Sequence, residues 1–355
     1  MFSLKQRDAL LASLRGINRP CRVMEVCGTH TVSIARSGLK QMLPPQIQLL
    51  SGPGCPVCVT AQGDIDAAIA LARIPGVTIL TFGDMIRVPG SESSLQMEHA
   101  CGRDIRILYS PYDALHIAME NPEQQVVFLA VGFETTMPLI AATIRSAAQQ
   151  RITNLSFFLM GKLLPPALRS LCKQDITRID GFLLPGHVTA ILGIEPLQFL
   201  ATEFGRPGVV AGFQPEEILL ALAILVRRIG AGEIGVEIAY RSVVRPEGNR
   251  TAKALLKEVF QPTDVTWRGL GLIPDSGLAF QSSYANFDAR KRFSLQEFAS
   301  KDHDGCLCGE ILCGRFTSKD CPLFDHACTP ETPIGPCMVS SEGSCAAAYR
   351  YERWK

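Results

Sequence analysis

Two close pairs of potential metal ligands stand near the beginning of the chain. Cys27 and His30 form a C-x2-H pair, and Cys55 and Cys58 form a C-x2-C pair after a gap of 24 residues. A spacing of two residues lets both side chains of a pair reach one metal ion, or lets two cysteines form one disulfide. These four residues are therefore a candidate site for metal or thiol chemistry.

Three kinds of site fit this spacing. A C-x2-H pair combined with a C-x2-C pair is typical of structural zinc. The run Cys55-Pro56-Val57-Cys58 before an expected helix also fits a thioredoxin-like disulfide, because a helix N-terminus lowers a thiol pKa. The third kind is a transition metal held for chemistry. The Gly52-Pro53-Gly54 turn favours this last interpretation, since it lets the backbone approach a ligand closely.

A second group of cysteines lies near the end of the chain, and no cysteine occurs between residues 173 and 305. Its members are Cys306, Cys308, Cys313, Cys321, Cys328, Cys337 and Cys345. Four thiolates in a loop-rich segment suit either zinc or an iron–sulfur cluster, and the spacing alone does not decide between them. Because this Cys-, Gly- and Pro-rich segment can bury little apolar surface, we expect a bound cofactor to hold its shape.

The elements that must position these residues follow an α/β pattern. From about residue 20 to 240, short β-branched runs alternate with amphipathic helical stretches. The expected strands cover residues 22–26, 47–50, 77–82, 105–109, 126–131, 155–159, 181–184 and 209–212. Nearly continuous apolar strands that alternate with helices predict parallel sheets covered on both faces.

Four of the expected strands end in unusual residues. Two lead into the cysteine pairs, the strand 126–131 leads to Glu134, and the strand 181–184 leads to His187. In open α/β sheets, ligands bind outside the carboxyl ends of the strands. We therefore expect the four loops to line one cleft between two α/β units. Glu134 and the two threonines after it would place hydroxyls and amide N–H groups at the start of a helix, which suits an anionic or strongly hydrogen-bonding ligand.

Composition excludes several classes of protein. The chain has 355 residues, 47% of them hydrophobic, with 35 basic and 34 acidic residues. A net charge of +1 argues against a protein that wraps nucleic acid. No apolar run approaches the roughly 20 residues of a membrane span, and the N-terminus lacks the features of a signal peptide. We expect a cytoplasmic protein, in which 13 cysteines indicate metal or redox chemistry.

Seven motifs occur in the order in which they occur in the HypD family of hydrogenase maturation factors, and the chain resembles that family over nearly its whole length. The motifs are M-E-V-C-G-T-H (24–30), G-P-G-C-P-V-C (52–58), T-F-G-D-M-I-R-V-P-G (81–90), G-F-E-T-T-M-P (132–138), P-G-H-V (185–188), W-R-G-L-G (267–271) and M-V-S-S-E-G-S-C-A-A (338–347). Thr29 stands where relatives can have glycine, and both residues are small.

The resemblance implies an α/β fold with two Rossmann-like parallel-sheet units that face a central cleft, followed by a C-terminal loop-rich iron–sulfur domain. The expected domains are residues 1–121, 122–240 and 241–355. The cluster pattern of the family, C-x12-C-x6-C-x16-C, implies a [4Fe-4S] cluster on four cysteines of the second group. These four are Cys308, Cys321, Cys328 and Cys345.

The resemblance also implies a role in assembling the Fe(CN)2CO unit of [NiFe] hydrogenases. The metal ligands would be Cys27, Cys55 and Cys58, with His30 and Glu134 as proton carriers or hydrogen-bond donors beside the iron. Soft thiolates bind iron well. The implied partners are the small chaperone HypC and the cyanide-donating HypE. Such a protein is an assembly scaffold with redox-active thiols rather than a conventional turnover enzyme.

Two other functions remain open from the residues. One is an iron–sulfur-linked thiol–disulfide oxidoreductase that acts through Cys55 and Cys58, which would not need Cys27 or His30. The other is a zinc-stabilised interaction protein without redox chemistry.

Overall fold

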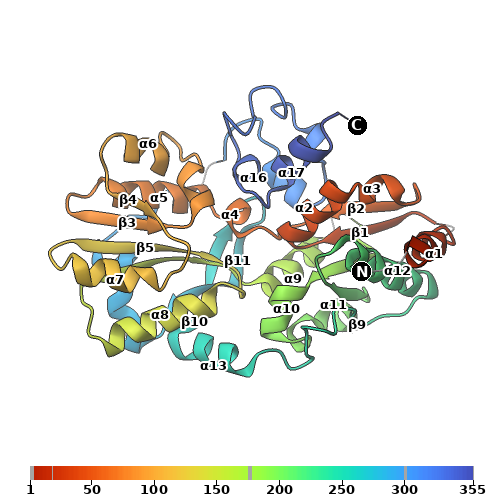
Figure 1. Cartoon of the computed structure of the whole chain (residues 1–355), viewed down its shortest axis with the longest axis horizontal. Helices are drawn as coiled ribbons and strands as arrows, with labels where there is room; N and C mark the ends of the chain where they lie inside the picture. Colours follow the sequence, from red (N-terminus) through yellow and green to blue (C-terminus); the bar gives the residue numbers. More distant parts are fainter. Residues whose placement is uncertain (1–3, 18, 175–177, 300–301, 355) are drawn as a thin grey trace.

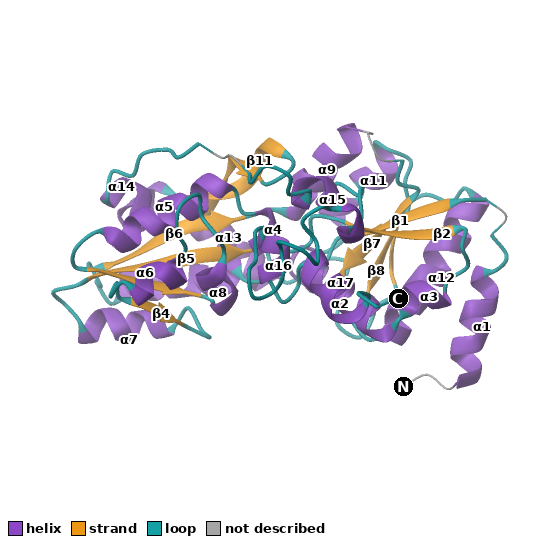
Figure 2. Cartoon of the chain, turned by 90° about the horizontal axis from the view of Figure 1, so that it is seen from above, coloured by secondary structure: helices purple, strands orange, loops and turns teal. Residues whose placement is uncertain are grey.

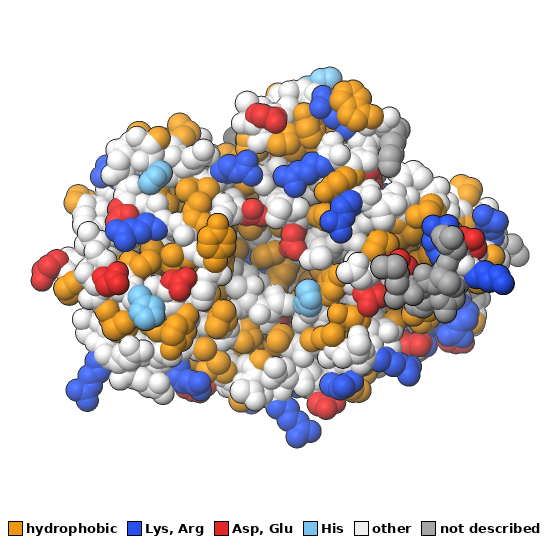
Figure 3. All heavy atoms as spheres, viewed as in Figure 1, with side chains coloured by type: hydrophobic (Ala, Val, Ile, Leu, Met, Phe, Trp, Pro, Cys, Tyr) orange, Lys and Arg blue, Asp and Glu red, His pale blue; other side chains and the backbone are white. Residues whose placement is uncertain are grey.

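The structure, a computed structural model, describes residues 4–17, 19–174, 178–299 and 302–354. Two lobes, each built on a parallel sheet, stand side by side, and the C-terminal segment lies above the region where they meet (Figure 1). In the space-filling view, the middle of this face is recessed between the lobes (Figure 3).

Sheet 1 has five parallel strands in the order β2-β1-β7-β8-β9. Its strands are β1 (Cys21–Glu25), β2 (Ile47–Ser51), β7 (Gly181–Pro185), β8 (Gly208–Ala211) and β9 (Val236–Ile238). The helices of this lobe are α1 (Leu4–Leu14), α2 (Gly28–Ser37), α3 (Leu39–Met42), α10 (Gly186–Leu192), α11 (Phe199–Thr202) and α12 (Pro215–Ala231). Every residue of β7 and β8 is buried, as expected for parallel strands with both faces covered.

Sheet 2 has four parallel strands in the order β4-β3-β5-β6. Its strands are β3 (Val77–Thr81), β4 (Ile105–Ile107), β5 (Gln125–Gly132) and β6 (Leu155–Gly161). The helices of this lobe are α5 (Gln62–Arg73), α6 (Leu95–Ala100), α7 (Asp113–Glu120), α8 (Met137–Gln149) and α14 (Ala289–Arg292). The confirmed part of the expected fold is thus two parallel-sheet α/β units.

The remaining elements join the lobes and form the C-terminal segment. They are α4 (Pro56–Val59), α9 (Leu164–Gln174), α13 (Arg250–Val259), the antiparallel pair β10 (Phe260–Trp267) and β11 (Gly271–Phe280), α15 (Cys308–Leu312), α16 (Pro336–Val339) and α17 (Ser344–Tyr351). Seen from above, α4 and α16 lie in the middle, between the two sheets (Figure 2). None of the described helices combines the length and apolar character needed to cross a membrane.

The sheets do not follow the expected boundary between residues 121 and 122. The chain forms the first two strands of sheet 1, then all of sheet 2, and then returns to sheet 1 with β7, which pairs with β1. The boundary also divides sheet 2, because β3 before it pairs with β5 after it. Strand positions follow from local apolar runs, whereas partners so far apart in sequence leave no local signal.

The eight expected strands are present, with ends shifted by at most a few residues. The sequence analysis missed β9 and the hairpin β10–β11. All three residues of β9 are half-buried, and β10 carries polar residues and Pro262. Such strands lack the continuous apolar run that marks a buried parallel strand.

Candidate functional site

The two cysteine loops lie next to each other because their strands do. Cys27 precedes the first residue of α2 and follows β1, while Cys55 precedes α4 and follows the neighbouring strand β2. The backbone N–H of Gly28 donates to the carbonyl of Gly54 at 3.0 Å and ties the loops together. The three cysteines of the predicted site therefore belong to one group of loops at the carboxyl end of sheet 1.

Cys55 and Cys58 form a disulfide, with their Cα atoms 5.2 Å apart. Both residues are buried, and the backbone N–H of Cys58 points at the sulfur of Cys55 at 3.1 Å. Cys27 is a free thiol and partly exposed. The arrangement thus offers one free thiol beside a disulfide whose reduction would supply two more.

Gly54 makes the close approach of these loops possible. A Cβ atom at this position would collide with the backbone of Val26 and Cys27. We expect Gly54→Ala to lower the free energy of unfolding by about 2–4 kcal/mol, since neither backbone segment can move without disturbing β1. Chemical denaturation measures this change. The control is Gly230→Ala in α12, where a Cβ meets nothing within 4 Å and where we expect about 0.5–1 kcal/mol of stabilisation. Equal effects of the two substitutions would contradict the prediction.

Glu25 positions the Cys27 loop and was missed in the sequence. One carboxylate oxygen accepts a hydrogen bond from the backbone N–H of Cys27 at 3.1 Å, and the other accepts one from the Thr31 hydroxyl. Burial raises the pKa of Glu25 to about 7 and that of Cys27 to about 12. A cation bound next to Cys27 would therefore be needed to hold it as a thiolate at neutral pH. An acidic residue inside an apolar strand was the available signal.

His30 lies fully buried beside this loop. Its Nε2 lies 2.9 Å from the carbonyl oxygen of Gly212. Its ring stacks on that of Phe213, with the ring centroids 5.1 Å apart. Burial lowers the pKa of His30 to about 4, so the ring is neutral and Nε2–H donates to the carbonyl. Nδ1 then carries a lone pair, and within the described part of the chain it has no hydrogen-bond partner. The ring of His187 also stacks on Phe213, with the centroids 3.9 Å apart. Two of the four expected loops, those of His30 and His187, therefore meet here.

A loop of the C-terminal segment, residues 340–343, covers the cysteines, although the sequence indicated only loop packing. The Thr29 hydroxyl donates to Glu342 Oε1 at 2.6 Å, and Ser340 Oγ lies 3.4 Å from the sulfur of Cys55. The Ser340 hydroxyl also donates to Asp84 of sheet 2 at 3.1 Å. Asp84 and Glu342 both lie within the motifs quoted above. Their contacts join residues more than 250 positions apart, so the sequence spacing could not predict them.

Glu134 lies apart from these contacts. Its Oε1 accepts a hydrogen bond from the backbone N–H of Leu164 at 2.9 Å, and its buried Oε2 has no partner among the described residues. Burial raises the pKa of Glu134 from 4.5 to about 7. No hydrogen bond within the described residues connects it to Cys27, Cys55 or Cys58, so its predicted part in the site stays a prediction.

The raised pKa of Glu134 predicts a pH dependence of stability. Because folding favours the protonated form, the contribution of this group is complete below about pH 4.5 and is lost as pH rises through about 7. We expect Glu134→Gln to match the wild type near pH 4.5 and to be more stable by roughly 3 kcal/mol at pH 8. Urea unfolding at both pH values measures this, with the exposed Glu123→Gln as control. A constant difference between the two pH values would contradict the prediction.

Six C-terminal cysteines line one small cavity together with apolar residues such as Phe324 and Met338. They are Cys306, Cys308, Cys321, Cys328, Cys337 and Cys345. Cys313 is not among them, and its sulfur points at the carbonyl of Gly269 at 3.6 Å. The structure thus brings together the four expected cluster cysteines, with two further cysteines beside them.

The donor set of this cavity fits an iron–sulfur cluster. Burial and the neighbouring thiols raise the pKa of Cys345 well above the ordinary value, so several thiolates need a cationic group to neutralise them. The backbone N–H of Ile334 donates to the sulfur of Cys328 at 3.3 Å, and such hydrogen bonds are usual at cluster thiolates.

Comparison with known proteins shows the family of the chain. The family model described as "HypD: Hydrogenase formation hypA family" matches residues 5–352. Hydrogenase maturation factor HypD2 of Bradyrhizobium diazoefficiens is 45% identical, with 95% of this chain and 91% of that protein covered. Hydrogenase maturation factor HypD of Escherichia coli is 45% identical, with 94% of this chain and 90% of that protein covered. That of Azotobacter vinelandii is 42% identical, with 98% of this chain and 94% of that protein covered. The chain therefore belongs to the HypD family of hydrogenase maturation factors.

Proposed function

We propose that this hydrogenase maturation factor is the scaffold on which the Fe(CN)2CO unit of [NiFe] hydrogenases is assembled. The observation that carries the proposal is the group of three cysteines at the carboxyl end of sheet 1, one free and two in a disulfide, beside the loop 340–343 with its Glu342 carboxylate. Cysteine thiolates suit iron with strong-field ligands. The iron unit is the cargo of the protein.

Cys27 and Cys58 are the principal anchors in this proposal. Reduction breaks the Cys55–Cys58 bond, takes up two electrons and two protons, and yields two thiols, of which Cys58 joins Cys27 at the iron and Cys55 completes the set. Nδ1 of His30, which has no hydrogen-bond partner among the described residues, would serve in this proposal as a hydrogen-bonding group beside the iron.

A [4Fe-4S] cluster on Cys308, Cys321, Cys328 and Cys345 would supply electrons for this reduction. The cavity supports the assignment because it gathers these four sulfurs against apolar walls, close to the loop that covers the disulfide. The chain itself contributes the protected environment, the hydrogen bond to Cys328 and the positions of the thiolates.

The expected partners are the chaperone HypC and the cyanide-donating HypE. The recessed face between the lobes leaves room for part of a second protein (Figure 3). Cys27 at the edge of the site is partly exposed, so a partner's group can reach the iron from this side.

The disulfide also supports a second function, an iron–sulfur-linked thiol–disulfide oxidoreductase that acts through Cys55 and Cys58. Infrared spectroscopy and metal analysis separate the two. The protein is purified without oxygen together with HypC. Cyanide and carbonyl stretching bands are expected for the scaffold. About four irons per chain without such bands would favour the oxidoreductase, and zinc without iron would overturn both functions.

A further inference from the structure

The tip of the hairpin β10–β11 lies between the two thiol sites. On one side, the backbone N–H of Arg268 donates to the carbonyl of Val59, the last residue of α4, at 2.9 Å. On the other side, Gly269 packs against Gly309, the residue after Cys308, so closely that a Cβ on Gly269 would collide with it. One short turn therefore contacts the helix of the disulfide and the helix that carries a predicted cluster ligand.

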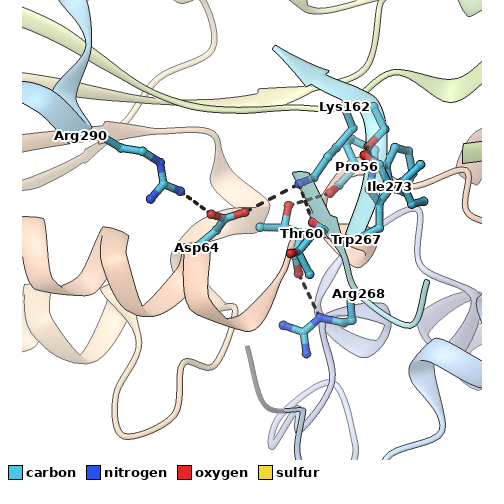
Figure 4. A network of polar contacts seen from close by, with 10 residues as sticks. Pro56, Thr60, Asp64, Lys162, Trp267, Arg268, Ile273 and Arg290 are labelled. Carbon is cyan, nitrogen blue, oxygen red and sulfur yellow. Dashed lines mark hydrogen bonds and ion pairs between the residues drawn. The ribbon is translucent and has the colours of Figure 1, made fainter. Parts of the chain in front are cut away.

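The side chain of Arg268 is almost completely buried in this turn. Its Nε donates to the carbonyl of Thr60 at 3.0 Å (Figure 4). One terminal nitrogen donates to the Gln62 side chain at 2.9 Å. The other terminal nitrogen pairs with Asp302 at 2.6 Å, and this carboxylate is 40% exposed. Burying an arginine costs more than burying an apolar side chain of similar size. Its position next to α4 therefore suggests a use for the charge.

The hairpin tip is also fixed from sheet 2. Lys162, at the end of β6, is 1% exposed and donates to the carbonyl of Thr266 at 2.9 Å. The ammonium group lies 3.7 Å from Asp64, which also pairs with Arg290 (Figure 4). These contacts hold the strand that leads into Arg268, so the guanidinium cannot move freely away from α4.

The turn that carries Arg268 lies close to both thiol sites. Thr60 follows Cys58 by two residues, so their Cα atoms are at most about 7–8 Å apart. On the other side, Gly269, the residue after Arg268, packs against Gly309, the residue after Cys308. Arg268 and the glycine after it therefore contact backbone within two residues of a cysteine of each site, and a buried charge is little screened over so short a range.

We propose that Arg268 is a positioning residue that links the two thiol sites. It fixes the end of α4 against the C-terminal segment, and its charge favours the negative charge that develops at either site during electron transfer. The part of this proposal that concerns the C-terminal cysteines rests on the proposed function. The part that concerns Cys55 and Cys58 does not.

The chemistry can be followed with dithiothreitol as the reductant. Its thiolate attacks one sulfur of the disulfide, the Cys55–Cys58 bond breaks, and the other sulfur leaves as a thiolate that takes a proton from water. The second thiol of the reagent then releases the protein thiol and closes a cyclic disulfide, so the reagent loses the two electrons that the protein gains. A nearby guanidinium stabilises the leaving thiolate and should accelerate the step.

The test compares the whole wild-type chain with R268Q, R268K and D302N. Reduction of Cys55–Cys58 by dithiothreitol is followed by thiol labelling and mass spectrometry, and the cluster potential by electron paramagnetic resonance during a redox titration. We expect R268Q to slow reduction of the disulfide about tenfold. For one-electron reduction of the cluster, it should lower the equilibrium constant tenfold, which lowers the reduction potential by about 59 mV. R268K should keep the potential near the wild-type value. D302N removes the partly exposed negative charge that pairs with Arg268, so it should raise the cluster potential.

Equal rates and potentials in the wild type, R268Q and D302N would overturn the role of Arg268. If R268Q fails to fold, D302N and R268K still test the proposal. A purely structural arginine would leave the cluster potential of D302N unchanged, whereas the proposal expects it to rise. A wild-type chain without a cluster would contradict the cofactor of the proposed function. The rate of disulfide reduction in R268Q then decides alone, and an unchanged rate would overturn the proposal.

Discussion

Replacing Cys27 with alanine is expected to remove the iron–cyanide–carbonyl unit from the protein, so that its infrared stretching bands disappear. Cys27 is the free thiol at the site when Cys55 and Cys58 are joined, and it is partly exposed whereas those two are buried. Loss of a thiolate ligand should weaken iron binding at least 100-fold, or about 3 kcal/mol. Infrared bands and iron content after purification with HypC measure the effect.

The fold should tolerate this substitution. The Cys27 side chain makes no capping hydrogen bond to α2, so alanine removes no structural contact of that kind. The matched control is Cys101→Ala, which alters an exposed free cysteine in the other lobe and should keep the bands. Bands of wild-type intensity in the Cys27→Ala protein would show that the iron is anchored elsewhere. Their loss in both variants would indicate general damage rather than a missing ligand.

Local patterns in the sequence were sufficient for the strands and for the loops that follow them. An apolar run such as that of β7 marks a buried strand by itself. In a parallel sheet, the loop after the carboxyl end of such a strand is where ligands bind. This is why the loops of Cys27 and Cys55 could be placed together before the structure was known. The pairing of β7 with β1 could not be predicted, because 155 residues lie between Glu25, the last residue of β1, and Gly181, the first residue of β7, and no local feature records the contact of the two strands.

The parts of the site that were missed depend on contacts between distant segments. Glu342 acts on the cleft only because its loop reaches Thr29, and Asp84 only because it meets Ser340. Glu25 is different, since its hydrogen bonds are local. A carboxylate in a buried strand was visible in the sequence and should have been read as a group with a polar task. Glu134 shows the opposite case, a predicted site residue whose contacts in the structure are with α9.

Replacing Cys345 with alanine is expected to remove the cluster and to loosen the C-terminal segment. Iron should fall from about four atoms per chain to fewer than one in the protein without cargo, and unfolding of this segment should become easier by several kcal/mol, because bound metal contributes directly to folding. Iron analysis and visible absorption measure the first effect, and hydrogen exchange of α17 the second. Cys337→Ala is the matched control, since Cys337 lines the same cavity but is an expected non-ligand.

The comparison of Cys345 with Cys337 also tests how the two thiol sites depend on each other. The loop 340–343 that covers Cys55 is held between these two cysteines, on α16 and α17. If the cluster fixes this loop, Cys345→Ala should also weaken the cyanide and carbonyl bands, although it changes nothing in the cleft. Cys337→Ala, which removes a small buried side chain, should cost about 1 kcal/mol and keep both the irons and the bands. Four irons retained in Cys345→Ala, or lost in Cys337→Ala, would assign the cluster to a different set of these cysteines.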